Sequence, residues 1–212
     1  MPRHRTGKIK RRRSEREPKA RFFLFCEGQN TEPAYFRAVR EELYGDVLLK
    51  IECGVGEPRT VAEKARERIR RKSKDSFQKN DRVWAIFDRD EHQKFDEAVD
   101  ICQANGIGMA RSNPCFELWL ILHEREYDIP DGSRAAQREL AKLRPEYDPE
   151  GGKIPNCKEM VERLPKAEER SRQQLNRRSR DNNNPFGRPS TTVGELTKEI
   201  REAHGRALRN QA

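Results

Sequence analysis

The sequence predicts an α/β protein whose mostly parallel, four-stranded sheet is flanked by helices and followed by a C-terminal helical extension. Short apolar runs alternate with amphipathic segments over residues 22–110, and parallel neighbours in a sheet require crossover connections of this kind. The chain is also 38% charged and only 33% hydrophobic, which predicts additional surface-rich helices. A length of 212 residues is enough for one catalytic core with additions.

The first predicted strand covers residues 22–26, Phe-Phe-Leu-Phe-Cys. A short run that is apolar throughout is typical of a strand covered on both faces. Thr31 is then a candidate N-cap for an amphipathic helix that reaches Leu43, with Pro33 tolerated in its first turn. This part of the chain therefore predicts a strand, an acidic turn at Glu27 and a helix.

The second predicted strand covers residues 47–53. A loop with two glycines follows, and the pattern Thr60-Val-Ala-Glu63 resembles a capping box. We therefore expect a very basic helix from Thr60 to about Lys74.

The third predicted strand, residues 82–87, ends in Asp88-Arg-Asp90. A helix is expected from about Glu91, because apolar residues then recur along one face. Residues 107–110 predict the fourth strand. The sheet of the core is therefore expected to end near residue 111.

Helices are expected in the remainder of the chain. Residues 116–123 are apolar and predict a buried helix capped by Asn113. From Ser133 onward the pattern is helical and charged, with breaks at residues 145–155 and 182–189. A second capping box, Thr192-Val-Gly-Glu195, predicts the final helix.

The positive charge of the chain is concentrated at its N-terminus. Residues 1–21 contain ten Lys or Arg and two Glu, so only +1 of the net charge of +9 remains for the rest. We interpret residues 1–21 as a disordered basic arm, residues 22–125 as the α/β core and residues 126–212 as the helical extension. The arm is either a solvated tail or a segment that contacts phosphates. The residues of this second interpretation are Lys10, Arg11, Arg12 and Arg13.

Several classes of protein are excluded by the composition. No apolar run is long enough to span a bilayer and none follows the arginine-rich start as a signal peptide would, so we expect a cytoplasmic protein. The five cysteines are scattered without a Cys-x-x-Cys pair, which indicates reduced thiols. The chain contains neither a P-loop nor a dinucleotide fingerprint.

Acidic residues follow two of the predicted strands. Ligands of open α/β sheets bind at the carboxyl ends of the strands, where Glu27 and the pair Asp88 and Asp90 are expected to converge. Clustered carboxylates suit Mg²⁺ or Mn²⁺, and such an ion activates water for attack on a phosphodiester. We therefore interpret these three residues as catalytic and metal-binding. The alternative is that Asp88 and Asp90 cap the helix that follows.

These residues also resemble the successive motifs of the RloB-like family. The matching segments are Phe-Cys-Glu27-Gly28 with Thr31-Glu32, Phe-Asp88-Arg-Asp90-Glu-His92, and the segment from Ser112 to His123. The resemblance implies a core related to the Toprim fold, in which the first Glu and the later Asp-x-Asp bind Mg²⁺. It also implies a role in bacterial anti-phage defence or abortive infection, with an ATPase as partner.

Five further residues are weaker site candidates. Glu117 is the one charge inside its apolar helix, and it either completes the cluster or pairs with an arginine such as Arg111. His92 and His123 are candidate acids or bases, although packed or surface histidines are commoner. Thr31 lies at a helix N-terminus that suits a phosphate, and Lys153 is a candidate cation for transition-state charge.

The expected function is Mg²⁺-dependent hydrolysis of DNA or RNA. The alternative is a non-catalytic subunit that binds nucleic acid or docks to a partner, with the acidic residues in a structural role. Phosphoryl or nucleotidyl transfer is a third hypothesis. The sequence leaves the oligomeric state and the choice between DNA and RNA open.

Overall fold

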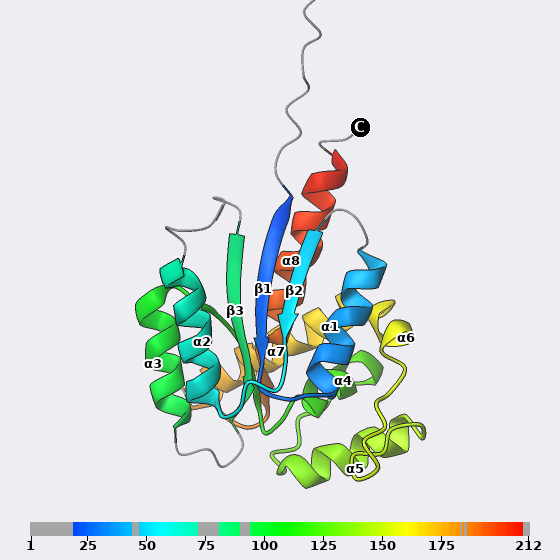
Figure 1. The fold of residues 1–212 in the computed structure, drawn as a ribbon. Helices are drawn as coiled ribbons and strands as arrows, with labels where there is room; N and C mark the ends of the chain where they lie inside the picture. Colours follow the sequence, from blue (N-terminus) through cyan, green and yellow to red (C-terminus); the bar gives the residue numbers. More distant parts are fainter. Residues whose placement is uncertain are drawn as a thin grey trace, which may run out of the picture.

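The computed structural model of the chain describes residues 19–43, 47–71, 81–89, 94–182, 184 and 186–209 (Figure 1). Its centre is a five-stranded sheet in the order β2-β1-β3-β4-β5. The first four strands are parallel and β5 is antiparallel to β4. The predicted α/β class and the mostly parallel sheet are thus confirmed. The strands are β1 (Ala20–Cys26), β2 (Val47–Glu52), β3 (Asp81–Asp88), β4 (Gly108–Asn113) and β5 (Ser190–Thr191).

The sheet has one strand more than the four that we predicted. In β5, Thr191 pairs with Ser112 and Ser190 pairs with Asn113. The next residue, Thr192, extends this contact because its hydroxyl accepts a hydrogen bond from the Arg111 N–H at 3.0 Å. The C-terminal segment therefore contributes to the sheet as well as supplying helices.

Helices cover both faces of the sheet (Figure 1). One face carries α2 (Pro58–Arg70) and α3 (Phe95–Asn105). The other face carries a larger helical layer, and both cores are built from alternating residues of the same strands. Phe23 and Phe25 face α2 and α3, whereas Phe22 and Leu24 face the larger layer. The larger layer contains α1 (Thr31–Glu42), α4 (Glu117–Glu124), α5 (Ser133–Leu143), α6 (Cys157–Val161), α7 (Leu164–Asn182) and α8 (Val193–Arg209).

The strand order reverses at β1. Helix α1 leads from β1 to β2 on one side, and α2 then crosses the opposite face to reach β3 on the other side of β1. A cleft for ligands typically forms at such a switch point, beyond the carboxyl ends of the two central strands. Here those ends carry Glu27 and Asp88.

Asn113 is not the N-cap of the helix that follows it, contrary to our prediction. It is the last residue of β4, and its side-chain amide donates to the carbonyl oxygen of Phe186 at 2.7 Å. Helix α4 begins at Glu117 with Phe116 as its N-cap residue. The Asn113 side chain therefore makes a tertiary contact instead of capping the helix.

Of the other three predicted caps, the one at Thr192 has the predicted position and the other two do not. Helix α1 has Asn30 rather than Thr31 as its N-cap residue. Helix α2 begins at Pro58, because proline is favoured in the first turn, so the box at Thr60 lies inside the helix. Helix α8 does begin directly after Thr192, but the Thr192 hydroxyl is bonded to the backbone of β4.

Several predicted residues lie outside the described part of the chain. They are Lys10, Arg11, Arg12 and Arg13 of the basic arm, together with Asp90 and His92. The helix expected near Glu91 is seen from Phe95 onward. Among the described helices, none combines the length and the apolar character needed to cross a membrane.

Candidate functional site

Four acidic side chains converge at the carboxyl edge of the sheet. Asp88 ends β3 and Glu27 follows β1, while Glu32 and Glu117 lie in the first turns of α1 and α4. Their proximity is shown by electrostatics, because the charges of Glu27, Glu32 and Glu117 each raise the pKa of the Asp88 carboxyl. The structure thus brings residues from the ends of β1 and β3 and from the starts of α1 and α4 into one acidic cluster.

Hydrogen bonds fix the orientation of each carboxylate in this acidic cluster. The Asp88 N–H donates to Glu27 Oε2 at 3.0 Å, and the Phe116 N–H donates to Asp88 Oδ2 at 3.1 Å. The Gly28 N–H donates to Glu32 Oε1 at 3.1 Å. Three of the four carboxylates are therefore held by backbone groups at the ends of strands and helices.

The fourth carboxylate is held by a side chain. The Tyr147 hydroxyl donates to Glu117 Oε1 at 2.8 Å, and Tyr147 lies in the turn after α5. Burial beside Glu117 raises the pKa of this hydroxyl, which keeps it a donor at neutral pH. Tyr147 could not be identified from the sequence, since thirty residues separate it from Glu117.

Burial and mutual repulsion raise two pKa values in the acidic cluster. For Asp88 burial is the largest cause, followed by the charges of Glu32, Glu117 and Glu27, and the Phe116 N–H opposes them. For Glu32 burial again raises the pKa most, backbone N–H groups oppose it, and Glu117 and Glu27 add to the rise. Concentrated negative charge of this kind favours a bound cation, which relieves the repulsion.

Glu117 was predicted either to join the cluster or to pair with an arginine such as Arg111. The structure places it in the acidic cluster, bonded to Tyr147. The Arg111 guanidinium donates to Ser190 Oγ at 3.1 Å and lies 4.0 Å from the centre of the Phe186 ring.

Glu32 is a member of the acidic cluster that the sequence analysis did not single out. Its place in the first turn of a helix is common for glutamate, so nothing marked it as unusual. The available signal was its spacing of four residues from Gly28. A Cβ added to Gly28 would lie 2.2 Å from Glu32 Oε2, so this position needs glycine for the carboxylate to fit.

Replacing Gly28 by Ala is expected to lower the free energy of unfolding by about 1 kcal/mol, because the half-buried site is overpacked and the Glu32 carboxylate must move away from the Gly28 N–H. The new methyl group and the Glu32 carboxylate cannot occupy the same space. Urea unfolding measures the change. The control is Gly205→Ala in α8, where the nearest contact of the new Cβ is 3.6 Å and alanine favours the helix. Equal stability of the two variants would contradict the expectation.

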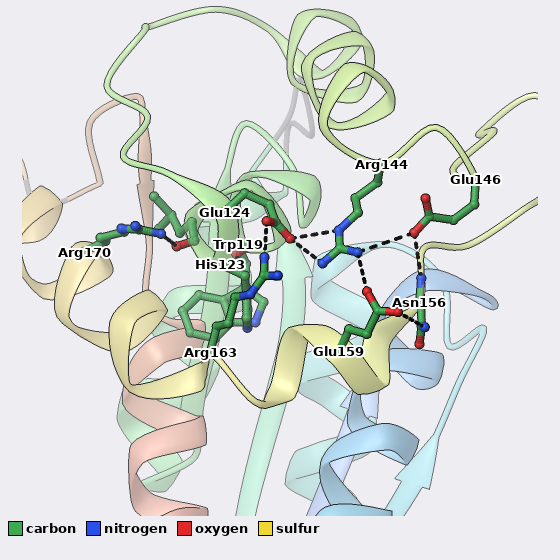
Figure 2. Close-up of polar contacts among 10 residues, drawn as sticks. Trp119, His123, Glu124, Arg144, Glu146, Asn156, Glu159, Arg163 and Arg170 are labelled. Atoms are coloured by element: carbon green, nitrogen blue, oxygen red, sulfur yellow. Dashed lines mark hydrogen bonds and ion pairs between the residues drawn. The ribbon is translucent and has the colours of Figure 1, made fainter.

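His123 lies at the opposite end of α4 from the acidic cluster. It is buried, and its Nε2 lies 3.0 Å from the Tyr35 hydroxyl. Its Nδ1 lies 3.0 Å from the carbonyl oxygen of Trp119 (Figure 2). Burial lowers its pKa to about 3, so the imidazole stays neutral near pH 7. The two tryptophans, Trp84 and Trp119, are also buried in the core.

The two remaining described candidates are more exposed. Thr31 is the first residue of α1 and is half-buried beside Glu32. Lys153 is exposed, and its backbone pairs with that of Asp148 in the turn after Tyr147. The structure shows no side-chain contact of Lys153 with the acidic cluster among the described residues.

Arg144 anchors the turn that carries Tyr147 (Figure 2). Its guanidinium donates to Glu124 Oε1 at 2.5 and 2.8 Å and to Glu159 Oε2 at 2.8 Å, and Arg163 also binds Glu124. The Tyr147 N–H in turn donates to the Arg144 carbonyl oxygen at 2.9 Å. An ion-pair network at the C-terminal end of α4 thus holds the turn from which Tyr147 donates to Glu117, at the N-terminal end of the same helix.

The acidic cluster has the right donors for a hard divalent cation. Carboxylate oxygens are the preferred ligands of Mg²⁺ and Mn²⁺, which also retain water. Within the described ranges no three His, Cys, Asp or Glu side chains already form a metal-binding arrangement. The predicted third ligand, Asp90, lies outside those ranges. The donor type and the negative charge of the acidic cluster suit such a cation, but the described side chains do not by themselves assemble three ligands.

Fold and site together define a doubly wound α/β protein with an acidic cluster at its topological switch point. The chain belongs to the RloB-like protein family, whose family model matches residues 22–200. The resemblance drawn from the three motifs is thereby confirmed. Neither the curated proteins nor the solved structures include a significant match to the chain.

Proposed function

We propose that this protein is a Toprim-like nuclease that uses Mg²⁺ or Mn²⁺ to hydrolyse phosphodiester bonds of DNA or RNA. The observation that carries the proposal is the meeting of Glu27, Glu32, Asp88 and Glu117 at the switch point of the sheet. Glu32 and Glu117 are buried and Glu27 and Asp88 are half-buried, and four carboxylates in such a place are costly unless a cation compensates them. A site that only stabilised the fold would not need such a concentration of like charge.

Glu27 and Asp88 are the proposed metal ligands, with Asp90 as the third. Mg²⁺ held by these residues would supply polarisation of the phosphoryl group and activation of water. Glu32 and Glu117 complete the acidic cluster, and a carboxylate that is not a ligand there can accept a proton from water.

The chain itself contributes positioning of these groups. The Phe116 N–H at the start of α4 holds Asp88, and the Asp88 N–H holds Glu27. Neither bond requires a side chain to reorganise, so the ligand oxygens are set in advance by the backbone. The Tyr147 hydroxyl likewise fixes the orientation of the Glu117 carboxylate. Preorganisation of this kind lowers the cost of binding a cation.

A second candidate function is a non-catalytic subunit in which the acidic cluster is structural. The same hydrogen bonds favour it, since Asp88 and Glu32 accept N–H groups that would otherwise lack partners at the ends of elements. The two functions differ in whether a cation binds.

Calorimetric titration distinguishes them. We expect the wild-type protein to bind Mn²⁺, and Glu27→Gln to weaken this binding by at least about tenfold, because loss of a ligand should cost no less than loss of a supporting group. The control is Glu41→Gln, which neutralises an exposed glutamate of the same type in α1. Absence of Mn²⁺ binding, or equal affinity in both variants, would favour the structural role.

The proposed substrate and setting rest on the resemblance to the RloB-like family. We propose a role in anti-phage defence together with a partner ATPase, as the resemblance implies. The direct test is incubation with Mg²⁺ and plasmid, single-stranded DNA or tRNA, alone and with the ATPase encoded by a neighbouring gene. Cleavage of one substrate class identifies the nucleic acid, and a requirement for the ATPase identifies the partner.

A further inference from the structure

A group of arginines lies at the same edge of the sheet as the acidic cluster. Arg89 directly follows Asp88 and its side chain faces the other way, with the guanidinium carbon 5.4 Å from the centre of the Phe95 ring of α3. Arg188 lies in the segment before β5, and Arg111 lies in β4. We call Arg89, Arg111 and Arg188 the arginine group.

The arginine group is organised around Phe186. Arg89 Nη1 donates to the Phe186 carbonyl oxygen at 2.7 Å. Arg188 Nε donates to Asn113 Oδ1 at 3.1 Å, and the amide nitrogen of Asn113 donates to the same Phe186 oxygen. Arg111 lies over the Phe186 ring at 4.0 Å. These contacts connect the end of β3, the end of β4 and the segment before β5.

The hydrogen bonds of Arg89 and Arg188 go to neutral oxygens. Other arginines at inter-element contacts meet carboxylates, as Arg144 does in Figure 2 and Arg201 does with Glu168, although Arg170 donates to the carbonyl oxygen of Leu122. Within the described residues, neither Arg89 nor Arg188 forms an ion pair. Burial lowers the pKa of the Arg111 guanidinium, the Glu195 carboxylate opposes this shift, and the nearby charge of Arg89 adds to it. Arg89 and Arg188 thus bring positive charge to this edge while their hydrogen bonds, among the described residues, go to neutral groups.

The members of the group differ in their access to solvent. Arg111 is 3% exposed, so it supports Phe186 from behind and cannot touch a ligand. Arg89 and Arg188 are half-buried. Each uses one nitrogen in the contacts above and retains further N–H donors, since a guanidinium carries five. A fixed guanidinium with remaining donors is well suited to a phosphate group.

We propose that Arg89 and Arg188 bind backbone phosphates of the nucleic acid strand beside the phosphodiester held at the acidic cluster. The inference rests on the proposed nuclease function and adds to it the surface that holds the substrate. An acidic cluster alone repels a polyanion, so a site of this kind requires cations that bring the strand to it. Arg89 is placed for this role because it adjoins Asp88 in the chain.

The test is binding without cleavage. The affinity of the full-length protein for fluorescein-labelled oligothymidylate and oligouridylate is measured by fluorescence anisotropy in EDTA, over a series of salt concentrations. We expect Arg89→Gln and Arg188→Gln each to weaken binding about tenfold, a typical cost of one charged contact. Each should also reduce the slope of log affinity against log salt by about one, as loss of one phosphate contact does.

The control is Arg206→Gln, which removes the same charge near the end of α8, where Arg206 is 57% exposed. The basic arm is present in every variant and contributes equally. Arg89→Lys is expected to keep the salt slope but to lose part of the affinity, because lysine retains the charge without the fork of donors. Thermal unfolding of each variant verifies that the fold is intact.

The outcomes separate this inference from the nuclease proposal. One outcome would overturn the inference alone: the wild-type protein cleaves with Mg²⁺, and the Arg89 and Arg188 variants bind the oligonucleotides with the same affinity and salt slope as Arg206→Gln. Binding that depends on Arg89 and Arg188 without cleavage would overturn the nuclease proposal alone. Failure of the wild-type protein to bind either oligonucleotide would also overturn the inference.

Discussion

Replacing Asp88 by Asn is expected to reduce metal-dependent cleavage at least about a hundredfold, more than loss of a supporting group costs, while the protein stays folded. The amide oxygen still accepts the Phe116 N–H, so the start of α4 keeps its partner. The substitution removes the negative charge of a carboxylate that is a proposed metal ligand. That carboxylate is also one of the mutually repelling ones, and its removal should leave the metal-free protein as stable as the wild type or more stable.

Two further variants make this result decisive. Asp88→Ala removes the acceptor as well as the charge, and an unsatisfied buried N–H typically costs about 1–3 kcal/mol. Asp100→Asn neutralises an exposed aspartate of α3 and should change neither activity nor stability. Cleavage rates come from a gel assay with Mg²⁺ and free energies of unfolding come from urea titration with EDTA. Unchanged cleavage by Asp88→Asn would show that Asp88 is not part of the active site.

Acidification is expected to destabilise the protein strongly through His123. Burial lowers its folded-state pKa from the ordinary value of 6.5 to about 3. Above pH 6.5 the imidazole is neutral in the folded and the unfolded chain, so the free energy of unfolding is at its full value. As the pH falls from 6.5 towards 3 this free energy decreases, because only the unfolded chain takes up a proton on His123. At about 1.4 kcal/mol per pKa unit the loss is at most about 5 kcal/mol.

The variant His123→Gln isolates this effect. Glutamine can form hydrogen bonds in the place of the imidazole but does not titrate. The raised pKa values of Asp88 and Glu32 act in the opposite sense, since their folded forms bind protons more readily and gain stability as the pH falls from neutral. They are present in both proteins, so the difference between the two urea-unfolding series reports His123. A difference that does not vary with pH would contradict the lowered pKa.

Part of the site could be predicted from sequence because buried parallel strands end at a common edge. The apolar runs before Glu27 and Asp88 predicted central strands, and the structure places both residues at the switch point. Glu117 was noticed for a similar reason, since a charge inside an apolar segment needs a partner. In each case the burial of the neighbours identified the residue.

The remainder depends on contacts between distant segments. Strand β5 has two residues, both polar, so it is too short to show a period. Asn113 has the composition of a cap, but the segment around Phe186 binds its side chain. Tyr147 carries no local feature that distinguishes it from other residues of turns. Hydrogen bonds across 30 to 80 positions are set by tertiary packing and not by local preference.

The pairing of β5 with β4 also has a kinetic consequence. Ser112 and Thr191 are 79 residues apart, so the loop that must close before they pair is long, and its closure entropy opposes early formation. During synthesis, β1 to β4 and the acidic cluster leave the ribosome well before the strand that covers the outer edge of β4. A nascent chain therefore presents an uncovered edge strand to its surroundings, and the protection of that edge against intermolecular pairing is completed last.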